Sequence, residues 1–96
     1  MANEKTAYQE KLEAQLEEIE AQMKKWRAKL NQLRADARIE AERQLDGLEQ
    51  QRDNVRKQLN ELRESSGDTW ENMKSSVDDA LNDLKQSFNN VMDRMR

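Results

Sequence analysis

The apolar residues in the last third of the chain recur at the spacing of an α-helix. Between residues 70 and 95 they are separated by three or four positions, so that on a helix they share an arc of about 100°. A helix buries a face of this width against another surface and leaves its polar positions in water. The pattern therefore predicts an amphipathic helix over about residues 69–95.

A second and longer helix is predicted for residues 4–64. Apolar residues follow the same spacing through residues 8–33 and again through residues 45–62, with only alanines on the stripe between these two runs. The chain has no proline, and most residue types in this segment are good helix formers. At 1.5 Å per residue, a continuous helix would be roughly 90 Å long.

The clearest interruption is the sequence Ser65-Ser66-Gly67-Asp68. Glycine adopts the left-handed conformation that often ends a helix, and an aspartate followed three residues later by a glutamate suits the start of the next one. We therefore expect a turn over residues 65–68. Gly47 lies inside an uninterrupted apolar pattern and is interpreted as an interior helix glycine, which costs about 1 kcal/mol relative to alanine.

Folding the shorter helix back on the longer one about this turn predicts an antiparallel coiled-coil hairpin. In this register Asp78 and Asp79 approach the basic residues of the long helix. They give acidic partners to Arg52 and Arg56, the first of which interrupts an otherwise apolar stripe. The predicted hairpin seam consists of Leu45, Leu48, Val55, Leu59, Leu62, Trp70, Met73, Val77, Leu81, Leu84, Phe88, Met92 and Met95.

The stripe over residues 8–33 has no partner within this hairpin. Monomers rarely expose an apolar strip of that length, so we expect two copies to associate through it into a helical bundle, with a dimer favoured. Residues 4–20 are mainly acidic and residues 24–43 mainly basic, which suits two such helices running antiparallel. The predicted self-association seam consists of Leu12, Leu16, Ile19, Met23, Trp26, Leu30 and Leu33.

An alternative architecture breaks the long helix near residues 34–38 and gives three helices of similar length in a monomeric bundle. The segment from Leu33 to Arg38 has no glycine, no proline and no cluster of capping residues, which favours the continuous helix. Both architectures are all-α with a single domain over residues 1–96. The three-helix alternative stays open.

Composition excludes several classes of function. Charged residues make up 39% of the chain and aromatic residues 4%, which suits elongated helices with narrow seams. The formal net charge of −3 gives no strong field toward nucleic acid, and acidic residues interrupt the basic ones between Lys24 and Arg43. Trp26 lies on the apolar stripe and is interpreted as a core residue. No nucleic-acid partner is expected.

The sequence offers no candidate catalytic residues. The chain lacks histidine and cysteine, which removes the usual general bases, thiol nucleophiles and zinc ligands. The acidic clusters within residues 17–20 and 78–83 lie off the apolar stripes and are interpreted as solvated faces. We therefore expect a non-enzymatic protein without catalytic residues, cofactor or metal.

A lipid surface is the alternative partner. No run approaches the roughly 18 apolar residues of a membrane span, and the first residues lack the apolar region of a secretory signal, so a cytoplasmic location is expected. The helix over residues 69–95 nevertheless suits a coat on a membrane or storage granule, for example under stress. Trp70 lies at one end, and Lys74 and Lys85 flank its apolar face. Its acidic polar face weakens attraction to anionic headgroups.

Three segments carry a resemblance to known proteins: YQEKLEAQL at residues 8–16, ADARIE at residues 35–40, and LRESSGDTWENMK at residues 62–74. They resemble a family of small bacterial coiled-coil proteins with apolipoprotein-like amphipathic helices. The resemblance implies a bacterial cytosolic protein and no catalytic residue. The sequence as a whole predicts a coiled-coil interaction or scaffold protein that acts through self-association, with a second protein partner also compatible.

Overall fold

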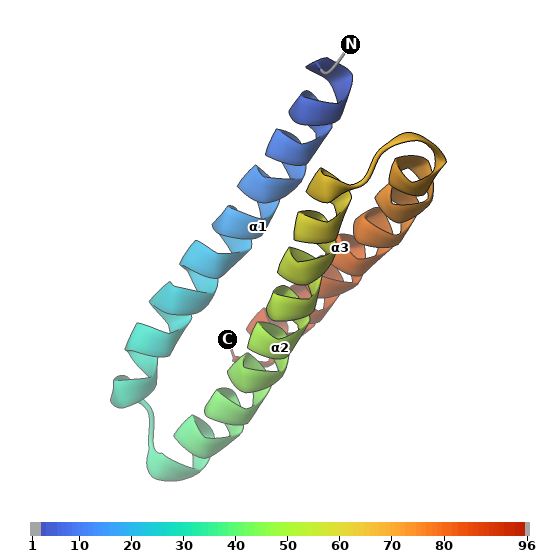
Figure 1. The fold of residues 1–96 in the computed structure, drawn as a ribbon. Coiled ribbons are helices and arrows are strands. Elements are labelled where there is room, and N and C mark those ends of the chain that lie inside the picture. Colours follow the sequence, from blue (N-terminus) through green and yellow to red (C-terminus); the bar gives the residue numbers. More distant parts are fainter. Residues whose placement is uncertain (1–2, 96) are drawn as a thin grey trace.

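The computed structural model describes residues 3–95, which form three helices and no strand. Helix α1 spans Asn3–Lys29 and continues into a short 3-10 turn, η1 (Leu30–Gln32). Helix α2 spans Ala35–Glu64, and α3 spans Gly67–Met95. The three helices lie side by side and alternate in direction, in a bundle of 53 × 18 × 18 Å (Figure 1). The predicted all-α fold is confirmed.

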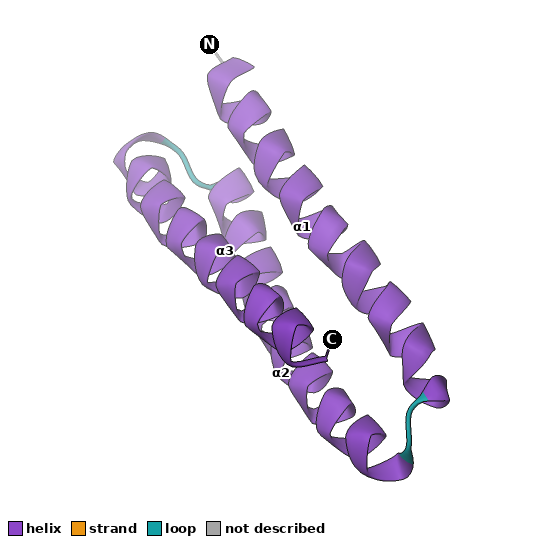
Figure 2. Ribbon diagram, turned by 180° about the vertical axis from the view of Figure 1, so that it is seen from behind, coloured by secondary structure: helices purple, strands orange, loops and turns teal. Residues whose placement is uncertain are grey.

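The continuous helix expected over residues 4–64 is wrong, because the chain turns back at Leu33 and Arg34. Both residues have extended backbone, with ψ angles of 155° and 157°. Seen from behind, the loops lie only at the two ends where successive helices join (Figure 2). The three-helix alternative is therefore the observed architecture, with its break at the start of the expected interval.

Burial of the α1 stripe explains why the helix breaks. Folding back places four large apolar side chains of α1 in the core, each at 7% exposure or less: Leu12, Leu16, Ile19 and Met23. Each is worth about 1.5–3 kcal/mol, or roughly 6–12 kcal/mol together. Interrupting a helix forfeits about four backbone hydrogen bonds and, at Arg34, begins a new helix without a side-chain cap. That loss is about 5 kcal/mol, so burial outweighs it.

The second connection follows the local chemistry of its sequence. Gly67 has a φ angle of +61°, the left-handed conformation that was predicted for it. The Ser65 backbone N–H and hydroxyl both donate to the Leu62 carbonyl, at 3.2 and 2.8 Å, and so cap the end of α2. Lys5 of α1 donates to the Ser65 carbonyl from the neighbouring helix. The turn thus occupies Ser65 and Ser66, and α3 begins two residues earlier than expected.

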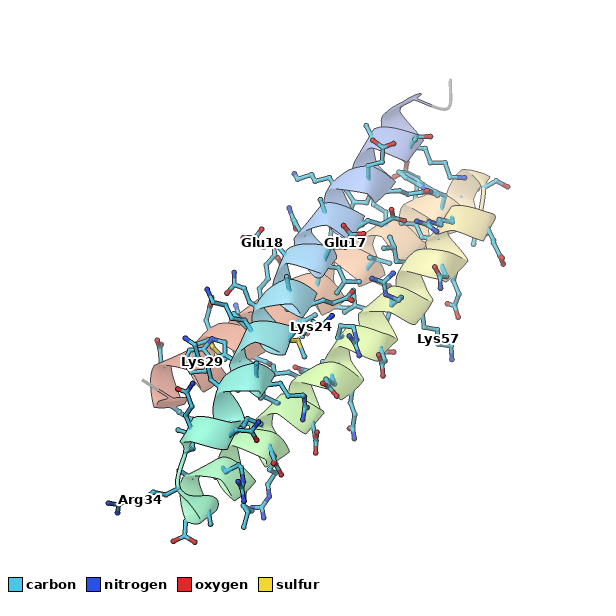
Figure 3. The ribbon with its side chains drawn as sticks, turned by 90° about the vertical axis from the view of Figure 1, so that its left-hand side faces the viewer. Glu17, Glu18, Lys24, Lys29, Arg34 and Lys57 are labelled. Atoms are coloured by element: carbon cyan, nitrogen blue, oxygen red, sulfur yellow. The ribbon has the colours of Figure 1, made fainter. Side chains whose placement is uncertain are left out.

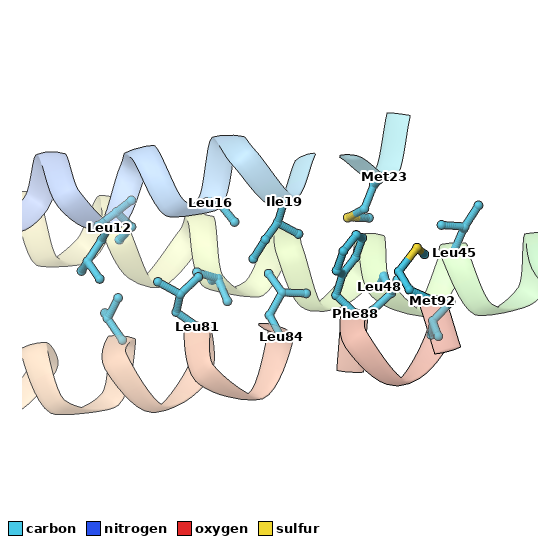
Figure 4. Close-up of a cluster of buried hydrophobic side chains, with 14 of the residues drawn as sticks. Leu12, Leu16, Ile19, Met23, Leu45, Leu48, Leu81, Leu84, Phe88 and Met92 are labelled. Atoms are coloured by element: carbon cyan, nitrogen blue, oxygen red, sulfur yellow. The ribbon is translucent and has the colours of Figure 1, made fainter. Parts of the chain in front are cut away.

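One hydrophobic core runs along the bundle and takes side chains from all three helices (Figure 4). In the close-up, Leu12 and Ile19 of α1 lie across from Leu81 and Leu84 of α3. The residues of the hairpin seam whose side chains are described are buried in this core, apart from Met73, which is half-buried. Met95 ends α3, and its side chain lies outside the described part of the chain.

The two glycines give opposite expectations for substitution by alanine. Gly67→Ala should lower the free energy of unfolding by about 1–2 kcal/mol, because a side chain is strained at its positive φ. Gly47→Ala should raise it by about 1 kcal/mol, since Gly47 lies inside α2 and no atom stands within 4 Å of an added Cβ at either glycine. Urea denaturation followed by circular dichroism measures both. Stabilisation by Gly67→Ala would contradict the left-handed turn.

Candidate interaction surface

The predicted self-association seam lies mostly inside the monomer. Five of its members are buried: Leu12, Leu16, Ile19, Met23 and Leu30. Trp26 is half-buried against the core, and Leu33 is 39% exposed. The premise that this stripe has no partner in its own chain is therefore wrong, because α2 and α3 cover it. Self-association itself remains a prediction.

Ion pairs hold the acidic half of α1 against the second half of α2. Glu13, in the N-terminal half of α1, pairs with Arg63. Further along, Glu20 pairs with Arg56 and, at 3.6 Å, with Arg52. Arg52 also contacts its neighbour Asp53 at 2.8 Å.

The expectation that Asp78 and Asp79 pair with these arginines is wrong. Arg52 and Arg56 have their carboxylate partner, Glu20, on α1 rather than on α3. The expectation assumed that only α3 packs on α2. Once α1 folds back along the other side of α2, the arginine side chains reach it instead.

The basic half of α1 is matched to acidic residues of α2. The Nη2 atom of Arg27 lies 3.0 Å from an Asp46 oxygen and 2.9 Å from a Glu49 oxygen. Burial lowers the pKa of Arg27, but the hydrogen bond to Asp46 and the charge of Glu49 raise it more, so that the net shift is upward. Exposed pairs of this kind are each worth about 1 kcal/mol or less, so together they fix register more than they add stability.

Most charged side chains of α1 point into solvent. Glu17, Glu18, Lys24 and Lys29 project from the outer face of the helix (Figure 3). Within residues 3–95, no three acidic, histidine or cysteine side chains converge as metal ligands would. This outer face is solvated, as the pattern indicated for Glu17 and Glu18. For Glu20 of the same cluster the interpretation is wrong, because its side chain faces α2 and pairs with Arg52 and Arg56.

An aromatic and basic corner joins the start of α1 to the start of α3. The rings of Tyr8 and Trp70 meet edge to face, with centroids 5.8 Å apart and planes inclined by 70°. The Lys74 ammonium lies 4.7 Å from the Tyr8 centroid and 5.4 Å from the Trp70 centroid, and Lys5 approaches Trp70 at 5.9 Å. Such geometries contribute about 0.5–1 kcal/mol each where they are exposed.

Tyr8 predicts a loss of stability at high pH. Its hydroxyl donates to the Lys74 carbonyl at 3.4 Å, and burial together with the nearby Asp78 carboxylate raises its pKa well above the ordinary value. The folded state therefore holds this proton more tightly than the unfolded state, so stability falls as pH rises above about 10. In urea titrations at pH 8 and pH 11, Tyr8→Phe should lose less stability between the two pH values than the parent chain. An equal loss in both proteins would contradict the assignment.

Large apolar side chains are exposed near the junction of α1 and α2. Among the residues whose burial is described, Leu33 at 39% and Ile39 at 56% exposure are the large hydrophobic side chains in solvent. Leu33 also lines a pocket of about 230 Å³ with Ala37 and Ala41 of α2, closed on one side by Arg94 of α3. This surface is the connection end of the bundle. Leu33 and Ala37 are called the connection patch below. Ala41 is buried beside them, and Ile39, two residues from both alanines, lies on the opposite side of α2.

A polar groove lies between α1 and α3. It has a volume of about 380 Å³, with Ile19 and Phe88 on its floor. Lys85 bridges the two helices by donating to the Gln15 side-chain oxygen at 2.7 Å. The bridge and the polar rim make the groove a part of the α1–α3 contact, and its apolar floor is small.

Two groups of residues were not predicted. Val91 is 5% exposed and belongs to the core, although it stands beside the stripe rather than on it. Its spacing of three from Phe88 is the signal that could have identified it. Glu13 and Glu20 join α1 to α2, but no pattern in the sequence distinguishes them from the solvated glutamates beside them.

These features define the chain as an antiparallel three-helix bundle. None of its described helices is long and apolar enough to cross a lipid bilayer. Comparison with family models, with curated proteins and with solved structures gave no match. The resemblance to small bacterial coiled-coil proteins therefore stays a prediction.

Proposed function

We propose that this chain is a non-enzymatic interaction protein that acts as a small scaffold through self-association. The observation that carries the proposal is the placement of exposed apolar side chains at one end of the bundle, in the connection patch. The rest of the apolar stripe is already covered by the chain itself. The proposed setting is the bacterial cytoplasm, in line with the resemblance.

The connection patch is an apolar surface that gains free energy when an apolar partner covers it. Leu33 and Ala37 are exposed beside the buried Ala41, and the small side chains of the two alanines let another chain approach α2 closely. An exposed leucine gains about 1 kcal/mol or more when a partner covers it. A second copy brings the same patch, so one surface serves both sides of a symmetric contact.

The test is a charged double substitution in the patch. Leu33→Glu with Ala37→Glu should abolish dimers that the parent chain forms at high concentration, because each new carboxylate would be buried in the contact. Sedimentation velocity between about 10 µM and 1 mM measures the mass, at concentrations that span weak and moderate association. The expected result is a concentration-dependent dimer for the parent chain and a monomer for the variant.

A matched control carries the same added charge away from the patch. Gln50→Glu with Gln51→Glu places two carboxylates at exposed positions in the middle of α2. This variant should dimerise as the parent does. A parent chain that remains monomeric over the whole range would overturn the proposal, and so would equal loss of dimer in both variants.

The second candidate function is a coat on a lipid surface. It is favoured by the separation of apolar and acidic residues onto different faces of α3. Its apolar side chains, from Trp70 to Met92, share one face, whereas Asp79, Asp83 and Asp93 are exposed on the other. That apolar face is turned into the core, so contact with lipid requires the bundle to open. The acidic outer face points to vesicles of neutral headgroups.

Binding to vesicles separates the two candidates. Phosphatidylcholine vesicles should shift the emission of Trp70 and carry the protein to the top of a density gradient if it coats lipid. Trp26→Phe leaves Trp70 as the only tryptophan, so the emission reports α3 alone. Unchanged emission and no flotation at excess lipid would exclude the coat.

A further inference from the structure

The two connections of the bundle differ in how strongly their sequences require a turn. Ser65 caps α2 through its own hydroxyl, and Gly67 supplies the positive φ that follows. The connection at Leu33 and Arg34 has neither device: Arg34, which precedes α2, makes no side-chain cap, and both residues have φ angles open to any residue. The residues around it are good helix formers.

We infer that two copies of this chain associate by exchanging helix α1. This inference rests on the proposed self-association and specifies how it occurs. In the exchanged dimer, residues 33 and 34 become helical, so that α1 and α2 of each copy form one continuous helix. The α1 of each copy then packs on α2 and α3 of the other.

The exchange keeps every contact that holds α1 in the monomer. Leu16 and its neighbours enter the same core, now supplied by the other copy. The charge pattern is equally satisfied between copies, since Glu13 again meets Arg63 and Arg27 again meets Asp46. No new interface is needed along α1, which is why exchange of a whole element is an accessible route to dimers.

The connection is where the two forms differ. In the monomer, Leu33 is 39% exposed and the break interrupts the backbone hydrogen bonds between η1 and α2. In the exchanged dimer those hydrogen bonds are restored. The two long helices run antiparallel and cross at their connection patches, so that Leu33 and Ala37 of one copy face those of the other. A connection of only two residues favours such an exchange.

Proline at position 35 distinguishes the two forms. Ala35 is the first residue of α2, where proline is well tolerated because the first backbone N–H has no partner within the helix. Arg34 already has the extended backbone that a residue before proline prefers. In a continuous helix the same proline lies in the interior and removes a hydrogen bond. Ala35→Pro should therefore keep the monomer and weaken the exchanged dimer by about a hundredfold or more.

The distance between the two ends of the long segment is the direct measurement. The chain has no cysteine, so Lys11→Cys with Glu64→Cys gives two unique attachment points at exposed positions. In the monomer these positions are neighbours, because Glu13 pairs with Arg63 beside them. In a continuous helix these positions, 53 steps apart in the chain, would be separated by roughly 80 Å. Energy transfer within one doubly labelled chain, diluted into excess unlabelled chain, reports which form is present.

The expected result is that refolding at high concentration yields a dimer whose labelled chains have lost energy transfer. Ala35→Pro should remain monomeric with full transfer, and Ala35→Ser, which keeps the backbone N–H, should dimerise as the parent does. A dimer that retains full transfer would overturn the exchange while leaving self-association standing. A chain that never dimerises would overturn both. Should Ala35→Pro fail to fold, the energy transfer in the parent dimer still shows whether helix α1 is exchanged.

Discussion

Leu16→Asp should cost this protein most or all of its stability. Leu16 has no exposed surface and lies in the middle of α1, facing the core that α2 and α3 supply. An aspartate there loses the burial of the leucine and places a carboxylate among apolar side chains, a combined cost of about 5 kcal/mol or more. Small domains have about 5–15 kcal/mol in total. Thermal unfolding followed by circular dichroism should show a broad transition at much lower temperature, or none.

The matched control for this variant is Ala14→Asp. Ala14 is exposed two positions before Leu16, so the same residue enters the same helix on its solvent side. Its cost is about 1–2 kcal/mol, from helix propensity and from repulsion by Glu10, Glu17 and Glu18 one turn away. Similar destabilisation by the two variants would mean that α1 does not pack on the hairpin in solution.

Trp70→Ala should remove about 3–5 kcal/mol from the free energy of unfolding. Trp70 is 9% exposed at the end of the bundle where α1 and α3 begin, and its ring receives the edge-to-face contact from Tyr8. Removing the ring leaves a cavity and takes away the surface over which Lys5 and Lys74 lie. Urea denaturation followed by circular dichroism gives the value.

Trp70→Phe separates the ring from the indole N–H. The Nε1 atom of Trp70 is buried without an acceptor in the described part of the chain, so deleting it removes no hydrogen bond. The phenylalanine variant should therefore lose less than half of what the alanine variant loses. Equal losses would show that the contacts of the six-membered ring contribute little.

Local chemistry explains which features could be predicted from the sequence. The helical spacing of apolar residues identified the buried faces of α2 and α3 because each helix turns by a constant angle, whatever it packs against. Gly67 identified its turn for a similar reason, since its positive φ is a property of one residue and its neighbours. Val91 was not predicted, because it adjoins Met92 and both residues lie at the edge of the apolar face of α3.

The partners of charged side chains could not be predicted in the same way. Arg52 and Arg56 signalled that acidic residues lie near, but Glu20 of α1 and Asp78 of α3 are equally acceptable partners by charge. Only the side of α2 on which α1 lies decides between them. That position depends on the chain folding back at Leu33.

The sequence by itself determined that the chain is helical, which faces of its helices are apolar and where α2 turns into α3. Each of these follows from the preferences of neighbouring residues. The break at Leu33 and Arg34 was decided only by the tertiary structure, because every local preference there favours a continuous helix. Burying the stripe of α1 on α2 and α3 outweighs those preferences by a few kcal/mol. The same small margin makes the connection the place where a second copy can take over the contact.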